Sequence, residues 1–395
     1  KNVCAVGDDD QSIYAFRGSN PEYLLKFEKD FPEAEIVTLN QNYRSAHEIV
    51  AAANQIISQN KNRRLKKMSA QFSDGKPPIL FFPYNEEEEA TSIVTDIQEK
   101  ITQGYKPDDF AILFRTNTGS RAIFERLANS SLPFAIDQDA ESFYERFVVN
   151  CMLSFLKLSC NEDDKLALKH ILPALFLKQA VLNDIMAESI LNSCSLLDCL
   201  QNIKTGFAFQ ESKLKKAVPI IKAIAKLTPL KAMELIEEEL GFHDFIKKRG
   251  NEGNKFDKGS DDLNDLKVAA KNFTSIREFI DHAEHMAAMN KEIKQFSKKN
   301  SQAITLSTIH RAKGLEYKIV YIVGAVDGSL PHDYALDAYR NGDIAPLEEE
   351  RRLLYVALTR AMEQLYISVP ERRRGKKAAP SRFLSPVTKE KNVRY

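Results

Sequence analysis

The segment Thr305-Leu-Ser-Thr-Ile-His-Arg-Ala-Lys-Gly-Leu-Glu316 passes from one local pattern to another. Residues 305–309 alternate between polar and apolar side chains, as a strand does, and residues 310–316 follow as a short turn of helix at its end. Other strand-like runs, rich in β-branched and aromatic residues, occur at residues 2–6, 35–39, 79–82, 110–114, 134–136, 303–307, 319–323 and 364–369. Helix-patterned stretches such as residues 86–103 separate them. This alternation predicts an α/β fold with a largely parallel sheet.

The middle of the chain has a different pattern. Between residues 141 and 300 there is no comparable strand signal, and leucine, alanine and lysine dominate segments with helical periodicity. Examples are residues 218–227, with Pro219 at the start of a helix, and residues 275–289. Glycine and polar residues at 250–254 are typical of a mobile loop. The simplest architecture is one α/β domain that is interrupted by an all-helical insertion and completed by the C-terminal quarter.

Length and composition limit the classes of protein to which the chain can belong. Its 395 residues exceed what one hydrophobic core usually holds, and its formal charge of +1 gives no overall signal for nucleic acid binding. The five cysteines form no C-x-x-C pair, which argues against a disulfide framework or a zinc site. No apolar run reaches the ~20 residues that span a membrane, and there is no signal-peptide pattern. We therefore expect a cytoplasmic protein that does not contact membranes.

The segment Val6-Gly-Asp-Asp-Asp-Gln-Ser-Ile-Tyr-Ala-Phe-Arg-Gly18 places polar side chains directly after the first strand-like run. Open α/β sheets bind ligands beyond the carboxyl ends of their strands, where residues 8–11 are expected to lie. Gln11 is neutral and can both donate and accept, so it can contact a phosphate or an attacking water without adding negative charge. The three aspartates lack the alternating spacing and the final Glu of a calcium loop, so we expect no metal there.

Aromatic and cationic side chains follow in the same segment. Tyr14, Phe16 and Arg17 are spaced so that two rings and a guanidinium lie close together. Bases of single-stranded DNA stack on aromatic rings for roughly 1–3 kcal/mol each, with little dependence on base sequence. The spacing therefore suits contact with single-stranded DNA, and ordinary core aromatics are the alternative.

The segment Leu39-Asn-Gln-Asn-Tyr-Arg-Ser45 precedes a helix that we expect to open with a capping box formed by Ser45 and Glu48. Arg44 would then lie on a rigid segment of backbone directly before the start of the helix. A guanidinium held in this way can meet the charge that develops on a transferring phosphoryl group. A surface arginine beside a structural Tyr43 is the alternative.

The segment Glu348-Glu-Glu-Arg-Arg-Leu-Leu-Tyr-Val-Ala-Leu-Thr-Arg360 has the pattern of an amphipathic helix. Its apolar stripe consists of Leu354, Ala357, Leu358 and Ala361. Arg360 projects beside Leu353 and Val356, on a semi-apolar face. A guanidinium in such surroundings requires an anionic partner, and a structural carboxylate is one candidate.

Three further groups of polar residues are candidates for binding. The segment Phe114-Arg-Thr-Asn-Thr-Gly-Ser-Arg121 follows a strand and offers Arg115, Asn117 and Arg121 to DNA phosphates, with a solvated loop as the alternative. The basic run at residues 61–67 offers a patch that could face DNA, or a solvated face. The histidines of residues 282–285 have no third ligand nearby in sequence, so we expect no metal site.

The four blocks that begin at Val6, Leu39, Thr305 and Glu348 resemble, in this order, the later motifs of superfamily 1 DNA helicases of the UvrD/Rep/PcrA type. The phosphate loop of that family, G-x-x-x-x-G-K-[ST], occurs nowhere in the chain. The resemblance implies a RecA-like, P-loop NTPase-type parallel sheet domain interrupted by an all-helical insertion domain. It also implies these parts: residues 1–38, the end of a first RecA-like motor domain; residues 39–143, the first part of the second; residues 144–300, the helical insertion; residues 301–371, the remainder of the second motor domain; and residues 372–395, a basic tail that we expect to be disordered.

The resemblance further implies roles for single residues. For ATP, Gln11 senses the γ-phosphate, Arg44 acts as an arginine finger, Arg360 makes a second γ-phosphate contact, Tyr43 stacks on the adenine and Glu316 binds the ribose. The residues implied for DNA are Tyr14, Phe16, Arg17, Arg115, Asn117, Thr308 and His310. Full-length relatives use ATP and Mg²⁺, and the acidic block that binds Mg²⁺ in them is absent from this chain.

Activity follows by the same resemblance. We expect the full-length parent to be an ATP-dependent 3′ to 5′ helicase that moves along single-stranded DNA in repair or replication, acting at junctions with duplex DNA. We expect this chain alone to hydrolyse no ATP. One alternative is a protein-interaction module whose helical insertion docks a protein partner. Another is the helicase part of a helicase–nuclease, although no nuclease carboxylate cluster follows Val369.

Overall fold

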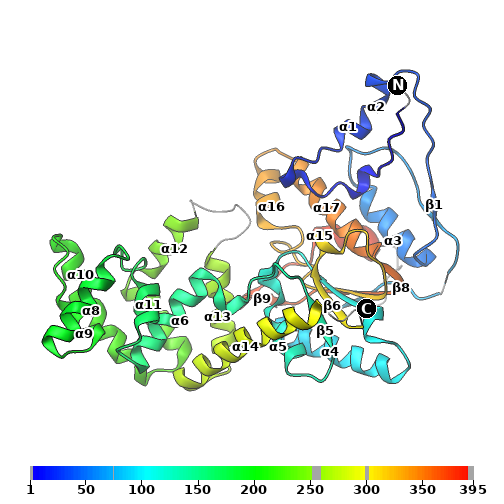
Figure 1. Ribbon diagram of the computed structural model, residues 1–395. Coiled ribbons are helices and arrows are strands. Elements are labelled where there is room, and N and C mark those ends of the chain that lie inside the picture. The colour runs from blue at the N-terminus through cyan, green and yellow to red at the C-terminus, as the bar shows by residue number, and fades with distance from the viewer. Residues whose placement is uncertain (1–2, 74, 251–258, 299–301, 390–395) are drawn as a thin grey trace. The chain divides into compact units, whose positions relative to one another are not determined.

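The computed structural model describes residues 3–73, 75–250, 259–298 and 302–389. The chain divides into two compact units, one made of residues 1–140 and 293–395 and the other of residues 141–292 (Figure 1). The second unit overlaps the helical insertion predicted at residues 144–300, but it starts three residues earlier and ends eight residues earlier. Every helix in the described ranges is too short or too polar to serve as a membrane span.

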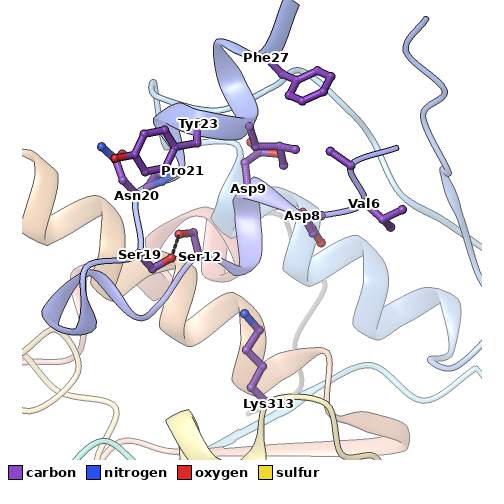
Figure 2. Close-up of a pocket in the computed structure, with 13 residues that line it drawn as sticks. Val6, Asp8, Asp9, Ser12, Ser19, Asn20, Pro21, Tyr23, Phe27 and Lys313 are labelled. Carbon is purple, nitrogen blue, oxygen red and sulfur yellow. Dashed lines mark hydrogen bonds between the residues drawn. The ribbon is translucent and has the colours of Figure 1, made fainter. Parts of the chain in front are cut away.

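The first unit begins with short helical turns. They are η1 (Asp9–Gln11), η2 (Ala15–Arg17), α1 (Glu22–Leu25) and α2 (Phe27–Asp30). η1, α1 and α2 border a hollow of about 470 Å³ that Asp9, Tyr23 and Phe27 line, and Lys313 points toward it from the turn after α15 (Ile309–Ala312) (Figure 2). The strand predicted at residues 2–6 is wrong for the described residues 3–6, which pair with no described strand. Residues with a high β-propensity form a strand only when the fold places another strand beside them.

A six-stranded parallel sheet forms the centre of the first unit. Its order is β3 (Ile79–Phe81), β8 (Ala361–Ser368), β7 (Tyr317–Ile322), β4 (Phe110–Phe114), β6 (Ile304–Thr308) and β5 (Phe134–Ile136). Every residue of β4 is buried, and Ile112 lies opposite Leu306 on one side and Tyr321 on the other. Parallel sheets need cover on both faces, which explains the continuous apolar runs in these strands. The prediction of an α/β fold with a parallel sheet is confirmed.

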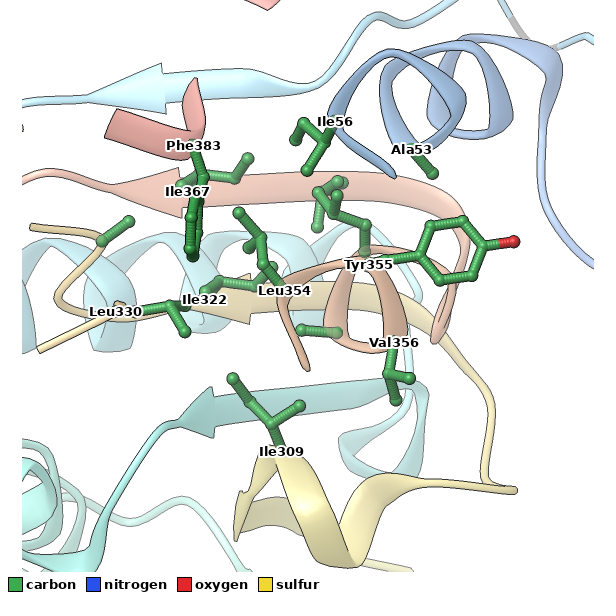
Figure 3. Close-up of a cluster of buried hydrophobic side chains, with 14 of the residues drawn as sticks. Ala53, Ile56, Ile309, Ile322, Leu330, Leu354, Tyr355, Val356, Ile367 and Phe383 are labelled. Atoms are coloured by element: carbon green, nitrogen blue, oxygen red, sulfur yellow. The ribbon is translucent and has the colours of Figure 1, made fainter. Parts of the chain in front are cut away.

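Helices cover both faces of the sheet. On one face, α3 (His47–Ile57), α17 (Ala345–Leu358) and α18 (Ser385–Lys389) contribute to a single apolar core with alternate residues of β7 and β8. Figure 3 shows Leu354 of α17 with Ile56, Ile322 and Ile367 in this core, while Val356 lies on the side of Ile309. On the other face, the hydroxyl of Tyr321 donates to Asp96 of α4 (Glu86–Thr102), which packs against α5 (Arg121–Ala128). The remaining elements of this unit are β1 (Gln41–Asn42), β2 (Ser69–Ala70), η3 (Pro107–Asp109), η4 (Asn117–Ser120), α16 (Asp333–Arg340), β9 (Arg372–Arg373), β10 (Lys376–Lys377) and η7 (Arg382–Leu384).

The secondary-structure elements described in the second unit are all helices. Its elements are η5 (Phe143–Glu145), α6 (Phe147–Cys160), α7 (Lys165–Ile171), α8 (Val181–Asn192), α9 (Leu196–Asn202), α10 (Ala208–Ala223), η6 (Ile224–Lys226), α11 (Pro229–Glu239), α12 (Phe242–Gly250), α13 (Gly259–Ala270) and the first part of α14 (Ile276–Ser297). α6 is buried along most of its length and packs against α7, α10, α11 and α13. The unit is therefore organised around one nearly apolar helix.

Several local predictions differ from the structure. Residues 35–39 form no strand, since Val37 and Leu39 are exposed and pairing begins only at β1, which bonds to β2. Pro219 lies inside α10 rather than at a helix start. The carbonyl that loses its bond there belongs to Lys215, which is exposed and can be solvated. The loop predicted at residues 250–254 lies outside the described residues from residue 251 onward.

The basic tail is also ordered where it is described. Residues 372–377 form an antiparallel pair of short strands, β9 with β10. Phe383, Leu384 and Val387 beyond them are buried in the core of the first unit. The prediction of disorder is wrong for residues 372–389, because apolar side chains that follow the basic run give this segment surface to bury.

Candidate functional site

The turn that carries Gln11 is held by buried ion pairs. Asp10, which is 1% exposed, receives two hydrogen bonds from the guanidinium of Arg63, at 2.8 and 2.6 Å. The ammonium group of Lys66 lies 3.0, 2.5 and 3.1 Å from carboxylate oxygens of Asp8, Asp9 and Asp10. Two protein cations, Arg63 and Lys66, thus offset most of the negative charge of the three aspartates. Arg63 and Lys66 belong to the basic run for which we expected either a patch facing DNA or a solvated face, and both expectations are wrong for these two buried side chains.

Electrostatics keep this cluster charged. Burial alone would raise the pKa of Asp9, but the hydrogen bonds from Lys66 and from the backbone amide of Arg64 outweigh it and hold the pKa below its usual value. Burial would likewise lower the pKa of Lys66, and the neighbouring aspartates raise it instead. The carboxylate of Asp9 and the ammonium group of Lys66 therefore remain ionised at neutral pH, and their attraction helps to fix the turn between Asp8 and Gln11.

Gln11 is oriented by this cluster. Its amide nitrogen donates to a carboxylate oxygen of Asp8 at 2.6 Å, and its backbone carbonyl accepts from the ammonium group of Lys313 at 2.8 Å. With the nitrogen bound to Asp8, the side-chain oxygen of Gln11 is the atom placed to accept a hydrogen bond from a ligand or water.

Aromatic side chains from two distant segments meet next to this turn. The rings of Tyr14 and Phe16 lie 5.9 and 5.4 Å from the imidazole of His310, and 5.9 Å from each other. The hydroxyl of Tyr14 donates to the backbone carbonyl of His310 at 2.7 Å. The guanidinium of Arg17 lies 5.5 Å from the ring of Phe16, which is 57% exposed. The structure therefore brings together four of the residues predicted for DNA, in a cluster we call the aromatic platform.

His310 is neutral in this setting. Burial lowers its pKa to about 3, with a further decrease from the positive charges of Arg115 and Arg17 and a small opposing effect of a backbone hydrogen bond to Ile13. A neutral imidazole offers a ring face and one acceptor rather than a cation. Thr308, at the end of β6, is half-buried and occupies the position directly before the first residue of α15.

A second group of predicted residues gathers around the end of α17. The guanidinium of Arg44 donates to Glu316 at 2.7 Å and to the carbonyl of Thr359 at 3.4 Å. The predicted capping box at Ser45 is wrong: α3 begins at His47, and the side-chain oxygen of Asn42 accepts instead from the amides of Arg44 and Ser45, each at 2.9 Å. This Asn-centred turn fixes the backbone that carries Arg44.

Arg360 is the most unusual side chain of this group. It is 1% exposed, and its guanidinium donates to the carbonyls of Val356 and Leu315 at 3.0 and 2.9 Å and to the hydroxyl of Thr359 at 3.2 Å. Within the described part of the chain, no carboxylate forms an ion pair with it. Burial, and then the nearby charge of Arg44, lower its pKa to about 10, so it stays charged at neutral pH. A buried cation whose partners are all neutral is poised to bind an anion.

Other predicted residues have different surroundings. Tyr43 is 71% exposed, so its ring is accessible to a ligand. The guanidinium of Arg115 donates to one carboxylate oxygen of Glu350 at 2.8 and 2.6 Å and to the other oxygen at 3.1 Å, and only 11% of its side chain is exposed. Asn117 is half-buried in η4. A DNA contact by Arg115 would have to compete with Glu350, and the structure does not place Arg115 on the aromatic platform.

Lys313 is a residue that the sequence reasoning missed. Its ammonium group bonds to the carbonyl of Gln11 and lies 5.3 Å from the ring centroid of Tyr14. Burial lowers its pKa, Asp8 opposes this decrease, and Arg360 adds to it. One side chain thus connects the turn of Gln11, the aromatic platform and the surroundings of Arg360. Its position in the run His310-Arg-Ala-Lys313, directly after a strand, was the available signal.

The parallel sheet, with polar and charged side chains collected where its strands end, defines a RecA-like α/β domain. Family models agree: the UvrD-like helicase C-terminal domain matches residues 37–372, and the UvrD/REP helicase N-terminal domain matches residues 1–32. The chain belongs to the UvrD-like helicase family.

Curated relatives support the same family. The chain is 52% identical over 387 residues to the "Putative ATP-dependent DNA helicase YjcD" of Bacillus subtilis, covering 98% of this chain and 50% of the relative. It is 31% identical over 408 residues to DNA helicase II of Rickettsia typhi, covering 100% and 60%. It is 30% identical over 411 residues to the ATP-dependent DNA helicase PcrA of Staphylococcus epidermidis, covering 99% and 55%. The chain spans about half to three-fifths of the length of these relatives.

Proposed function

We propose that this chain is the C-terminal part of an ATP-dependent DNA helicase that couples ATP hydrolysis to 3′ to 5′ movement along single-stranded DNA, including at junctions with duplex DNA. The observation that carries the proposal is Arg360, a buried guanidinium with neutral partners beside the more exposed Arg44. Two guanidiniums beside the single carboxylate of Glu316 leave a net positive site. Such a site suits the charge on a transferring phosphoryl group.

The surrounding residues fit a nucleotide. Tyr43 has an exposed ring for stacking on adenine, and Gln11 has a side-chain oxygen oriented to accept from a water. Glu316 is 54% exposed and pairs with Arg44 in this structure, so a ribose hydroxyl would compete with an exposed ion pair. Exposed ion pairs contribute at most about 1 kcal/mol, so this exchange costs little. Bound Mg²⁺ would neutralise phosphate charge, and its ligands would lie outside the residues of this chain.

The aromatic platform supports the DNA part of the proposal. Its rings offer base stacking without sequence preference, while the cation of Arg17 beside them suits a phosphate backbone. Lys313 supplies a physical link, because a change at Gln11 that moved this lysine would alter its contact with the ring of Tyr14. The division between the two matching family models, between residues 32 and 37, also agrees with two motor domains meeting near this point.

Binding of fluorescein-labelled oligothymidylate to this chain, measured by fluorescence anisotropy over a series of salt concentrations, tests the DNA proposal. We expect salt-sensitive binding that a Tyr14→Ala/His310→Ala variant weakens by about tenfold or more, since one stacking contact is worth roughly 1–3 kcal/mol. A Tyr339→Ala variant, which removes a ring that is 46% exposed outside the platform, is the matched control. Equal binding by wild type and the double variant would refute the platform as a DNA site.

The nucleotide proposal requires the full-length parent, since this chain has no phosphate loop and should hydrolyse no ATP alone. We expect Arg360→Ala in that protein to abolish DNA-stimulated ATP turnover, while Arg340→Ala, a surface arginine with a 70% exposed side chain, leaves turnover unchanged. Circular dichroism spectra of both variants serve as the control that each protein is folded. Wild-type turnover in the Arg360 variant would contradict the assignment.

A further inference from the structure

The helical unit contains a hollow of about 570 Å³ that the motor function does not use. It is lined by Phe176, Phe209, Lys213, Gly241, Asp244, Lys247 and Lys248. These residues come from the turn after α7, from α10, from the turn before α12 and from α12 itself. The volume falls in the range of sites that bind ligands or protruding side chains of a partner. We call this feature the lysine–phenylalanine hollow.

Positive charge converges on this hollow. The ammonium groups of Lys213 and Lys248 lie 4.4 and 4.9 Å from the ring centroid of Phe176, so two cations share one aromatic ring. Within the described part of the chain, Lys213, Lys247 and Lys248 form no ion pair with a carboxylate. Burial lowers the pKa of Lys213; Asp244 opposes this effect and Lys248 adds to it. Three lysines against one aspartate leave an excess of positive charge that an anionic ligand would relieve.

Two residues that line the hollow, Phe176 and Gly241, have backbone conformations with a positive φ. Phe176 has a φ of 61°, in the left-handed region that residues other than glycine seldom adopt, and its carbonyl accepts from the side chain of Gln210 at 3.1 Å. Gly241 has a φ of 69°, and a Cβ there would lie 3.6 Å from the ammonium group of Lys213. Strained residues persist where the surroundings hold them in place, often at binding sites. The ring of Phe176 is therefore held against the lysines by its turn.

Apolar surface accompanies the charge. Phe209, on the first turn of α10, is 76% exposed and lines the hollow. Exposed aromatic side chains next to a concave site are the residues that most often anchor a protein partner. The hollow thus combines an exposed ring with a convergent set of cations.

The charge of the whole unit indicates which anion fits. Residues 141–292 contain 21 Lys and Arg against 23 Asp and Glu, so the unit as a whole is slightly acidic. A long polyanion such as DNA would be repelled by much of this surface, because its binding relies on an extended stripe of positive charge. A short acidic segment needs only the local charge of the hollow.

We propose that the lysine–phenylalanine hollow binds an acidic segment of a partner protein, with an apolar side chain packed against Phe209 and flanking carboxylates paired with Lys213, Lys247 and Lys248. Lysine is suited to this role because its compact charge can follow a flexible peptide, whereas arginine favours planar, bidentate partners. The proposal goes beyond the motor function and rests on the helical unit alone, so either can fail without the other.

Selection of random phage-displayed peptides against the full chain tests this proposal, with counter-selection against a Lys213→Glu/Lys248→Glu variant. We expect the enriched peptides to carry Asp or Glu beside an aromatic or large aliphatic residue. Fluorescein-labelled synthetic copies should bind the wild-type chain, and should bind the charge-reversed variant and Phe209→Ala about tenfold more weakly or less. A Lys215→Glu/Lys226→Glu variant, which reverses two exposed lysines outside the hollow, is the matched control and should bind as wild type does.

Three outcomes would overturn the proposal. One is the absence of an acidic consensus among the selected peptides, and another is equal binding of acidic peptides by the wild type and the charge-reversed variant. The third is an affinity for oligothymidylate that falls in the charge-reversed variant but not in the control, which would assign the hollow to nucleic acid. If thermal melting shows that Lys213→Glu unfolds the unit, Lys247→Glu/Lys248→Glu, with both residues exposed on α12, replaces it with the same expected results.

Discussion

Lowering the pH from 7.5 to 5.0 is expected to destabilise the first unit through His310. Its pKa of about 3 in the folded protein lies below the ordinary value of 6.5 that it regains on unfolding. The unfolded chain therefore binds more protons than the folded chain between these two values, and stability falls as the pH drops below 6.5. Above 6.5 the imidazole is neutral in both states and contributes no pH dependence.

The size of this effect follows from the two pKa values. At pH 5.0 the imidazole is almost fully protonated in the unfolded chain and neutral in the folded one. The pH is then about 1.5 units below 6.5, and each unit corresponds to about 1.4 kcal/mol, so the expected loss is about 2 kcal/mol. The physical cause is first the burial of the ring and then the positive charges of Arg115 and Arg17.

Urea unfolding of the wild type and of His310→Gln, followed by circular dichroism at both pH values, measures this effect. Glutamine does not titrate, so the difference in unfolding free energy between the two proteins should change by about 2 kcal/mol between pH 7.5 and 5.0. All other titrating groups are shared and cancel in this difference. A difference that does not change with pH would refute the reasoning, as would a pKa near 6.5 for His310 in an NMR titration.

Three further changes have expected outcomes that thermal unfolding can check. Asp10→Ala leaves the buried guanidinium of Arg63 without its carboxylate and should cost about 3–5 kcal/mol; a loss below about 1 kcal/mol would contradict a buried pair. Phe383→Ala should cost about 3–5 kcal/mol, because the ring is 1% exposed in the core, and no loss would mean that the C-terminal segment is not docked. Gly324→Ala should destabilise by more than about 1 kcal/mol, because φ is +64° and a Cβ would collide with the guanidinium of Arg373; wild-type stability would exclude this packing.

Much of the fold could be predicted from local pattern. The six strands of the central sheet coincide with predicted runs, because a parallel sheet buried on both faces needs continuous apolar segments that show plainly in sequence. The residues 2–6 and 35–39 have the same composition yet form no strand where they are described, since a strand also needs a partner. The prediction that the basic tail is disordered was wrong for a related reason. It considered only the run of positive charges and not the apolar residues that follow this run and pack into the core.

For the candidate site, too, some features could be inferred from the sequence and others could not. The chemistry of Arg44, Arg360 and the aromatic residues could be inferred from their types and positions beside strand and helix ends. The partners that these side chains contact could not be inferred from the sequence. Lys66 lies among the aspartates at the start of the chain instead of facing outward, and Arg115 pairs with Glu350, 235 residues away in sequence. Long-range ion pairs of this kind leave no periodic signal.

Local patterns were enough to predict the six strands of the central sheet, a helical middle segment and the types of residue in the candidate site, because hydrophobic periodicity and residue type are local properties. Folding over long distances in the chain brought Tyr14 and His310, 296 residues apart, onto one platform, and it placed Lys313 between this platform and Gln11. It also decided that Arg360 is buried among neutral partners rather than beside a carboxylate. These arrangements depend on which strand ends meet at one edge of the sheet, and chain topology rather than local pattern sets that.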